Sequence, residues 1–150
     1  MVARFIAVGT ACLLALSVAG TVFAKSGGHV EIVVTIVNGQ ETRFEVIHGA
    51  EFLCTDGDAE NFFEKFGGAG PSAAGTFHGY KTLTCTDGSG TFNITYDAAT
   101  VWGSPQDQGG WHLYGGTDEF AGCSGGGNLV GLYPDENTIV DHYTGRVSCP

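Results

Sequence analysis

The chain has 150 residues, of which 25 are glycine, 16 are acidic and 6 are Lys or Arg, and its formal net charge is −10 at pH 7. This length fits one domain, and the acidic balance argues against nucleic-acid binding and against adhesion to anionic membranes, both of which depend on clustered Lys and Arg. With 43% hydrophobic and 15% charged residues, the composition is that of a folded chain rather than a disordered one.

The first 24 residues have the pattern of an export signal. Arg4 precedes an apolar stretch, and Val22 and Ala24 stand at the two positions that signal peptidase recognises. A retained membrane anchor is the alternative, but the apolar stretch is short for a bilayer span. We therefore expect a signal peptide over 1–24, a single secreted domain over 25–150, and no membrane partner after the signal is removed.

Four cysteines remain in the expected domain. They are Cys54, Cys85, Cys123 and Cys149. An even number of cysteines in an exported chain is typical of disulfides, whereas a zinc site would contain closely spaced pairs, which are missing here. Of the alternative connectivities we favour Cys54–Cys85 with Cys123–Cys149, because the first two cysteines begin similar Cys-Thr-Asp-Gly segments that a meander would bring side by side.

The expected domain alternates between short strand patterns and turn signals. Its first strand pattern, 30–36, alternates β-branched and polar residues, and Asn38-Gly39 is a strong hairpin signal that leads into 42–48. The other strand patterns cover 76–85, 91–101, 111–114, 128–133 and 138–147. In 76–85, Phe77, Lys81 and Leu83 share one face, and His78 and Tyr80 share the other.

One segment departs from this alternation. Residues 58–66 (DAENFFEKF) begin with Asp58, which suits a helix cap, and place phenylalanines near helical spacing. We therefore expect at most one short helix, near 58–66. The whole pattern predicts an all-β fold, an antiparallel barrel of about seven to eight strands, with a sandwich as the alternative. Closure into a barrel would remove the exposed edges of a glycine-rich sheet.

Several glycine-rich stretches occur in a familiar order. They are 75–79 (GTFHG), 84–92 (TCTDGSGTF), 111–122 (WHLYGGTDEFAG) with the glycines at 125–127, and 143–147 (YTGRV). This order resembles small secreted bacterial proteins of the allene oxide cyclase/dirigent-like barrel class, in which a Gly-Thr-x-x-Phe-Ala-Gly corner precedes a glycine-rich strand. The resemblance implies the barrel and an interior that can hold a cavity, in a class that includes a plant fatty-acid cyclase. It implies no particular reaction, because no catalytic residue of the plant enzymes matches a position here.

Histidines and paired carboxylates are the candidates for metal or acid–base chemistry. His78, His112 and His142 each lie opposite the apolar face of their strand, so they would approach one another, as zinc or copper requires, only if their strands were neighbours. The carboxylate pairs are Asp56 with Asp58, Asp118 with Glu119, and Asp135 with Glu136. They would suit a glycosidase couple, or with Glu60 a calcium site, but we favour a solvated acidic surface. We expect no metal and no cofactor.

Aromatic side chains are the candidates for ligand binding. Trp102 and Trp111 flank one predicted loop, and together with Tyr80 and Tyr96 they are the residues that we expect to bind an apolar molecule if the barrel encloses a cavity. Packing in the core is the alternative for the same side chains. Other polar and aromatic residues to inspect for chemistry are Glu45, His48, His78, His112 and Tyr114.

Three functions remain in competition at this point. We favour a secreted, disulfide-stabilised barrel that is not catalytic and binds a small apolar molecule, because the chain contains no nucleophile elbow, phosphate-binding loop or zinc-protease motif. The alternatives are a cyclase or isomerase of the allene oxide cyclase type, and a structural or interaction module with a filled barrel. A filled interior would exclude a ligand inside it, whereas a buried acid with a partner in a cavity would favour the enzyme.

Overall fold

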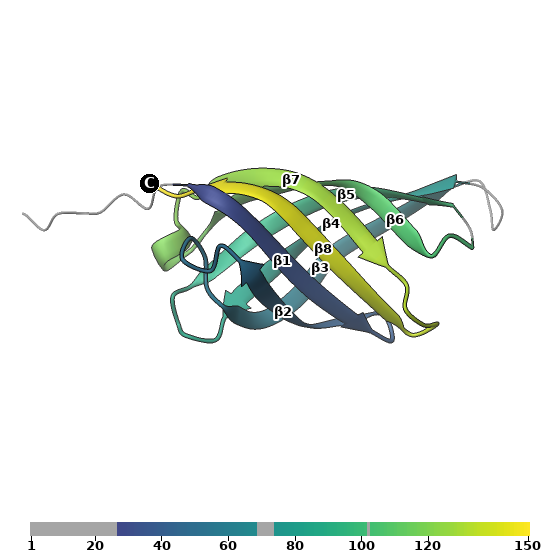
Figure 1. Ribbon diagram of the computed structural model, residues 1–150, viewed down its shortest axis with the longest axis horizontal. Helices are drawn as coiled ribbons and strands as arrows, with labels where there is room; N and C mark the ends of the chain where they lie inside the picture. Colours follow the sequence, from purple (N-terminus) through teal and green to yellow (C-terminus); the bar gives the residue numbers. More distant parts are fainter. Residues whose placement is uncertain (1–26, 69–73, 102) are drawn as a thin grey trace, which may run out of the picture.

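The computed structural model describes residues 27–68, 74–101 and 103–150, so the predicted signal peptide lies outside the described residues. Eight strands form a closed barrel in which each strand pairs with the next and β8 pairs with β1 (Figure 1). The strands are β1 (Gly28–Val37), β2 (Gln40–His48), β3 (Asp56–Gly68), β4 (Ala74–Cys85), β5 (Thr91–Val101), β6 (Gln106–Gly116), β7 (Ser124–Leu132) and β8 (Thr138–Ser148). All pairings are antiparallel, which confirms the predicted fold class.

The strand pairings differ greatly in length. β1 pairs with β8 along its whole length, whereas β2 pairs with β3 only at Phe44 with Gly57 and at Glu45 with Asp56. We call this short pairing the β2–β3 seam. It is the narrowest contact in the circle of strands, and the barrel is closed only as long as the seam holds.

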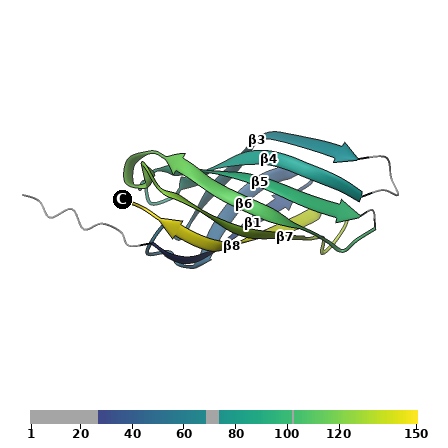
Figure 2. The same ribbon diagram turned by 90° about the horizontal axis from the view of Figure 1, so that it is seen from above.

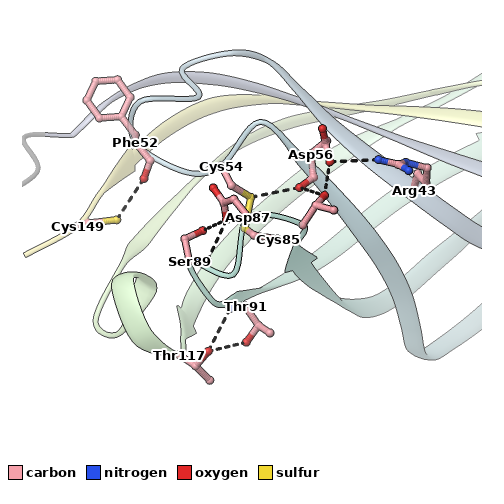
Figure 3. Close-up of a disulfide and its surroundings, with 11 residues drawn as sticks. Arg43, Phe52, Cys54, Asp56, Cys85, Asp87, Ser89, Thr91, Thr117 and Cys149 are labelled. Atoms are coloured by element: carbon pink, nitrogen blue, oxygen red, sulfur yellow. Dashed lines mark hydrogen bonds and ion pairs between the residues drawn. A yellow bond between two sulfur atoms is a disulfide. The ribbon is translucent and has the colours of Figure 1, made fainter.

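Side-chain contacts on Asp56 reinforce the seam (Figure 3). The Asp56 carboxylate lies 3.1 Å from Nη2 of Arg43 on β2 and accepts a hydrogen bond from the Thr86 hydroxyl. The backbone N–H of Val46 donates to the Thr55 carbonyl over 2.8 Å. The disulfide Cys54–Cys85 then ties the β2–β3 loop to the end of β4.

The two ends of the barrel are built differently, as the side view and the view from above both show (Figures 1 and 2). One end, which we call the stapled end, holds both disulfides, Cys54–Cys85 and Cys123–Cys149, and the short 3-10 turn η1 (Asp118–Phe120). The cysteine pairs are those predicted from the sequence. The other end, which we call the open end, holds the β1–β2, β5–β6 and β7–β8 turns, and there Asn38 N–H donates to the Asn137 carbonyl over 2.8 Å.

Large side chains fill the interior from the stapled end. Phe120 of η1 packs against Phe92, and Phe92 against Phe44, with ring centroids 5.4 and 5.5 Å apart. Further along, Tyr143 contacts the rings of Trp111 and Tyr96. An eight-stranded barrel is only wide enough for packed side chains or one small ligand, so these aromatics occupy the space that a ligand deep inside would need.

The glycines of β7 make room for Trp111. The Trp111 indole N–H donates to the carbonyl of Thr144 on β8 over 3.1 Å, so the indole spans β7, which lies between. Its register partner on β7 is Gly127. A β-carbon at Gly127 would collide with the same Thr144 carbonyl oxygen. The glycines at 125–127 belong to strand β7.

The helix expected near 58–66 is wrong, because these residues belong to β3. Ala59 faces the core and its neighbours Asp58 and Glu60 are exposed, which is strand alternation. β3 pairs with β4 from Gly57 to Gly68, with an irregularity between Asn61 and Phe63. That irregularity breaks the two-residue period, and pairing with β4 overrides a helical preference that the sequence alone could not weigh against it.

Strand β6 is also longer than predicted, since it begins at Gln106 instead of near Trp111. Its glycine-rich start pairs with both β5 and β7. A β-carbon at Gly109 would collide with the Asp97 carbonyl oxygen, so glycine is required for the close approach of β5. Composition marked this segment as a loop because close backbone packing and a turn both select glycine.

Removing either disulfide should lower stability by a similar amount. The disulfides join residues 31 and 26 positions apart, and loops of that size correspond to about 3.5 kcal/mol each in the chain-entropy model. We expect the double variants Cys54→Ala/Cys85→Ala and Cys123→Ala/Cys149→Ala each to lose free energy of unfolding of this order, measured by urea denaturation. A much larger loss for the first variant would show that it also releases the β2–β3 seam.

The variant Gly127→Ala should be destabilised by about 1–3 kcal/mol, as overpacked sites are. Its new methyl group would meet the Thr144 carbonyl that the Trp111 indole uses. The matched control is Gly110→Ala on β6, where the nearest atom to a β-carbon is 3.5 Å away. Thermal unfolding of both variants measures the difference, and equal midpoints would contradict the proposed role of Gly127.

Candidate functional site

A groove of about 590 Å³ opens at the open end of the barrel. It is formed by the end of β5, the β5–β6 loop, the β7–β8 turn and the start of β8, and its lining residues are Thr100, Val101, Gly103, Ser104, Tyr133, Asp135, Glu136, Thr138 and Ile139. Its volume falls in the range of small-molecule sites. The groove lies opposite the stapled end, beyond the aromatic core.

Local hydrogen bonds hold the walls of the groove. The Ser104 hydroxyl donates to the Gln106 carbonyl over 2.6 Å, and the N–H of Gln106 donates back to it over 3.2 Å. The N–H of Tyr133 donates to the Pro105 carbonyl over 3.0 Å, which joins the β5–β6 loop to the β7–β8 turn. Two segments distant in sequence therefore form one wall.

Asp135 lies on the rim of the groove in a turn that keeps it charged. Its Oδ1 accepts the backbone N–H of Asn137 over 2.8 Å. This hydrogen bond, followed by one from the Thr138 side chain, lowers the pKa of Asp135 because both stabilise the carboxylate form. The rim is thus negative at neutral pH.

Tyr133 connects the groove to a buried carboxylate. Its hydroxyl donates to Oδ2 of Asp107 over 2.7 Å, and Oδ1 of Asp107 accepts the N–H of Gly131 over 2.9 Å. Burial, together with the hydrogen bond to Asp107 and its charge, raises the pKa of Tyr133. The phenol is therefore a neutral hydrogen-bond donor and not a base at physiological pH.

Asp107 belongs to a buried row of residues across β6, β7 and β8. Asp107, Gly131 and Asp141 are register partners on these three strands. A β-carbon at Gly131 would collide with the Asp107 carboxylate and would come within 2.9 Å of Asp141 Oδ1. Glycine at this position therefore lets two carboxylates lie close together inside the barrel.

Lys81 is fully buried and faces Asp141 across the interior. Its Nζ lies 4.0 Å from Asp141 Oδ2 and 4.6 Å from the centre of the Tyr96 ring. The Tyr143 hydroxyl donates to the same Asp141 oxygen over 3.0 Å. Taking an ammonium group out of water is costly unless it is paired, and here a carboxylate and an aromatic face offset that cost.

Asn61 adds an acceptor to this interior. It is the register partner of Lys81 on β3. Its Oδ1 is buried and has no hydrogen-bond partner in the part of the chain that the structure describes. Buried polar atoms are usually satisfied, so this oxygen is an exception among the buried polar side-chain atoms of the described residues.

The described residues that were predicted to bind a ligand lie away from the groove. Tyr96 and Trp111 are buried in the core, whereas Tyr80 is 36% exposed on the outside of β4. Trp102 lies outside the described residues. None of the three described residues lines the groove, so their binding of a ligand stays a prediction.

The three histidines predicted to face outward do so on separate strands. His78, His112 and His142 belong to β4, β6 and β8, which are not adjacent. His78 pairs with Asp97, and His142 Nδ1 lies 3.2 Å from Glu31 Oε1. Among the described residues, no group of three or more His, Cys, Asp or Glu side chains is placed to hold a metal ion.

The remaining candidates are surface or turn residues. Glu45, His48 and Tyr114 are exposed on the outside of the barrel. Asp56 acts in the β2–β3 seam, Asp58 and Glu60 are exposed on β3, and Asp118 and Glu119 form η1 at the stapled end. Only the pair Asp135 and Glu136 lies at the groove. Sequence reasoning missed Asp107, Tyr133 and Asp141, although Lys81 on an apolar face was a signal of buried charge.

No family model, curated protein or solved structure matches the chain. The resemblance to the allene oxide cyclase/dirigent-like class therefore stays a prediction. Over the described ranges, the chain forms no helix of the length and apolar character needed to cross a bilayer.

The buried ion pair should be strongly coupled. The variant Asp141→Asn removes the negative charge 4.0 Å from the Lys81 ammonium and should lower the free energy of unfolding by about 3–5 kcal/mol, since it removes the charge of the carboxylate that faces a buried ammonium group. The double variant Lys81→Met/Asp141→Asn removes both charges and should lose less than the sum of the two single variants. Guanidinium denaturation of all three measures this coupling, and strictly additive losses would contradict it.

Proposed function

We propose that the protein is a secreted binding protein that holds a small molecule with an apolar body in the groove at the open end, and that it is not an enzyme. The observation that carries the proposal is the groove itself, of about 590 Å³, placed at the end of a rigid barrel opposite the disulfides. Val101, Ile139 and the Tyr133 ring supply apolar walls for such a ligand. Secretion is supported by the predicted signal peptide and by the two disulfides, which suit an oxidising compartment.

The filled core shifts the binding site from the interior to the mouth. The ligand predicted from the sequence would lie inside the barrel, but Trp111, Tyr143 and Phe92 are fully buried there. A ligand in the groove would instead lie between the β5–β6 loop and the β7–β8 turn. Threonine and serine hydroxyls on the same walls would orient its polar end.

The buried polar groups nearest the groove already have partners, which supports binding over catalysis. Asp107 accepts hydrogen bonds from the Gly131 N–H and from the Tyr133 hydroxyl. A carboxylate held in this way positions Tyr133, and the raised pKa of Tyr133 keeps the phenol protonated, so the deprotonated form that a general base requires is not populated at neutral pH.

An isomerase or cyclase of the allene oxide cyclase type is the second candidate. One observation favours it: the Tyr133 hydroxyl, on a groove-lining residue, is positioned by a buried carboxylate and can donate a hydrogen bond. Such an enzyme would act by holding a reactive substrate in one shape. If so, Tyr133→Phe should reduce turnover far more than ligand affinity, whereas a binding protein has no turnover to lose.

A titration with the apolar fluorescent dye Nile red tests the binding proposal. The variant Val101→Asp places a charge in the apolar wall and should weaken dye binding by about tenfold or more, equivalent to about 1.4 kcal/mol. The matched control is Ile47→Asp, because Ile47 and Val101 are exposed to similar extents, 56% and 58%, and Ile47 lies outside the groove. Equal loss of affinity in both variants, or no binding by the wild type, would overturn the proposal.

A further inference from the structure

A second group of ligating side chains lies on the outer surface, away from the groove. It contains three of the chain's five histidines, His29, His48 and His142, together with Glu31. They belong to β1, β2 and β8, which are consecutive around the barrel. Histidines are few in this acidic chain, so their gathering beside a carboxylate calls for a physical explanation.

A β-bulge places His48 on this surface. Glu31 pairs with His48 and the next residue, Ile32, pairs with Val46, so Ile47 is an extra residue on β2. Val46 faces the core, and strict alternation would also turn His48 inward. The extra residue instead leaves both Ile47 and His48 exposed, and His48 lies across from Glu31. Re-aiming a side chain is a common consequence of a bulge.

The spacing of His29 and His48 matches a metal-bound pair. Their ring centroids are 5.3 Å apart, with ring planes at 61°. With metal–nitrogen bonds of about 2.0–2.1 Å, a metal lies about 3.2 Å from each ring centre, so two imidazoles in a tetrahedral site stand about 5.2 Å apart. The centroid separation of the two rings therefore equals that of two imidazoles bound to one tetrahedral metal ion.

Charged neighbours frame the pair from both adjoining strands. On β1, Glu31 lies across from His48, and its Oε1 is held 3.2 Å from Nδ1 of His142 on β8. On β2, Glu45 is exposed on the same outer face. Arg146 on β8 is the register partner of His29, and the other arginine of this face, Arg43 on β2, is paired with Asp56. Glu31 and Glu45 place negative charge around the histidine pair, which favours a divalent cation.

We propose that His29 and His48 bind a divalent transition-metal ion, such as Zn²⁺ or Cu²⁺, on the outer face of β1 and β2. No third ligand is already in place among the described side chains, so water completes the coordination. Glu31, whose carboxylate contacts His142, contributes negative charge beside the two ligands. Imidazole ligands favour zinc and copper over calcium and magnesium, which prefer oxygen.

Calorimetric titration of the untagged, metal-free protein tests this site. The wild type should bind one Zn²⁺ or Cu²⁺ and should not bind Ca²⁺. His29→Ala and His48→Ala should each weaken binding by more than about tenfold, and Glu31→Gln by about tenfold, the lower range for residues that support ligands. His112→Ala is the matched control, because His112 is an exposed strand histidine on β6, and it should bind as the wild type does.

A second measurement separates loss of the site from loss of folding. Zn²⁺ should raise the thermal midpoint of the wild type and of His112→Ala, because it binds the folded state, but not that of His48→Ala. The midpoints without metal should agree among all three, since these side chains are exposed. The proposal is overturned if the wild type shows no saturable binding, or if His112→Ala loses as much affinity as His48→Ala. Nile red binding reports the groove separately, so either site can fail alone.

Discussion

Closure of the barrel depends on its narrowest contact, the two residue pairs of the β2–β3 seam. The other seven strand pairings are longer. If this seam parted, the barrel would become one open sheet with two exposed edges. Asp56 supports the seam from both sides, because it contacts Arg43 on β2 and Thr86 just after β4. The disulfide Cys54–Cys85 ties the loop next to this seam to the end of β4. A covalent bond therefore anchors the loop that leads into the shortest backbone pairing of the barrel.

This arrangement explains why the two ends of the barrel differ. Disulfides, η1 and the Phe120–Phe92–Phe44 contacts fill and fasten one end. Because the stapled end is fastened in this way, the turns at the open end need not close over the core, and they border the groove. Binding sites in small barrels commonly occupy such a mouth, because loops can vary without disturbing the core. The groove and the histidine surface thus lie on parts of the barrel that the core does not need.

Most strands and both cysteine pairs followed from local patterns, but β3, the start of β6 and the sites did not. Alternation at 30–36 and the Asn38-Gly39 turn predict β1 and β2 because both signals are local. Asp107, Tyr133 and Asp141 meet only once the register of three strands is known, and register cannot be deduced from one strand. His48 is a sharper case, since a single extra residue decides its face. The helical appearance of 58–66 failed for a related reason, because an irregularity in β3 mimics a change of period.

The buried pair of Lys81 and Asp141 also depends on strand register. Lys81 on β4 and Asp141 on β8 are not sheet neighbours, so they meet only across the interior. A slip of either strand by one residue would turn its charge outward and leave the other buried alone, at a cost of several kcal/mol. Buried apolar side chains such as Val34 and Leu83 depend less on one exact partner than a buried charge does. The ion pair therefore discriminates against misregistered barrels, and the same register brings Asp107 to Tyr133, a residue that lines the groove.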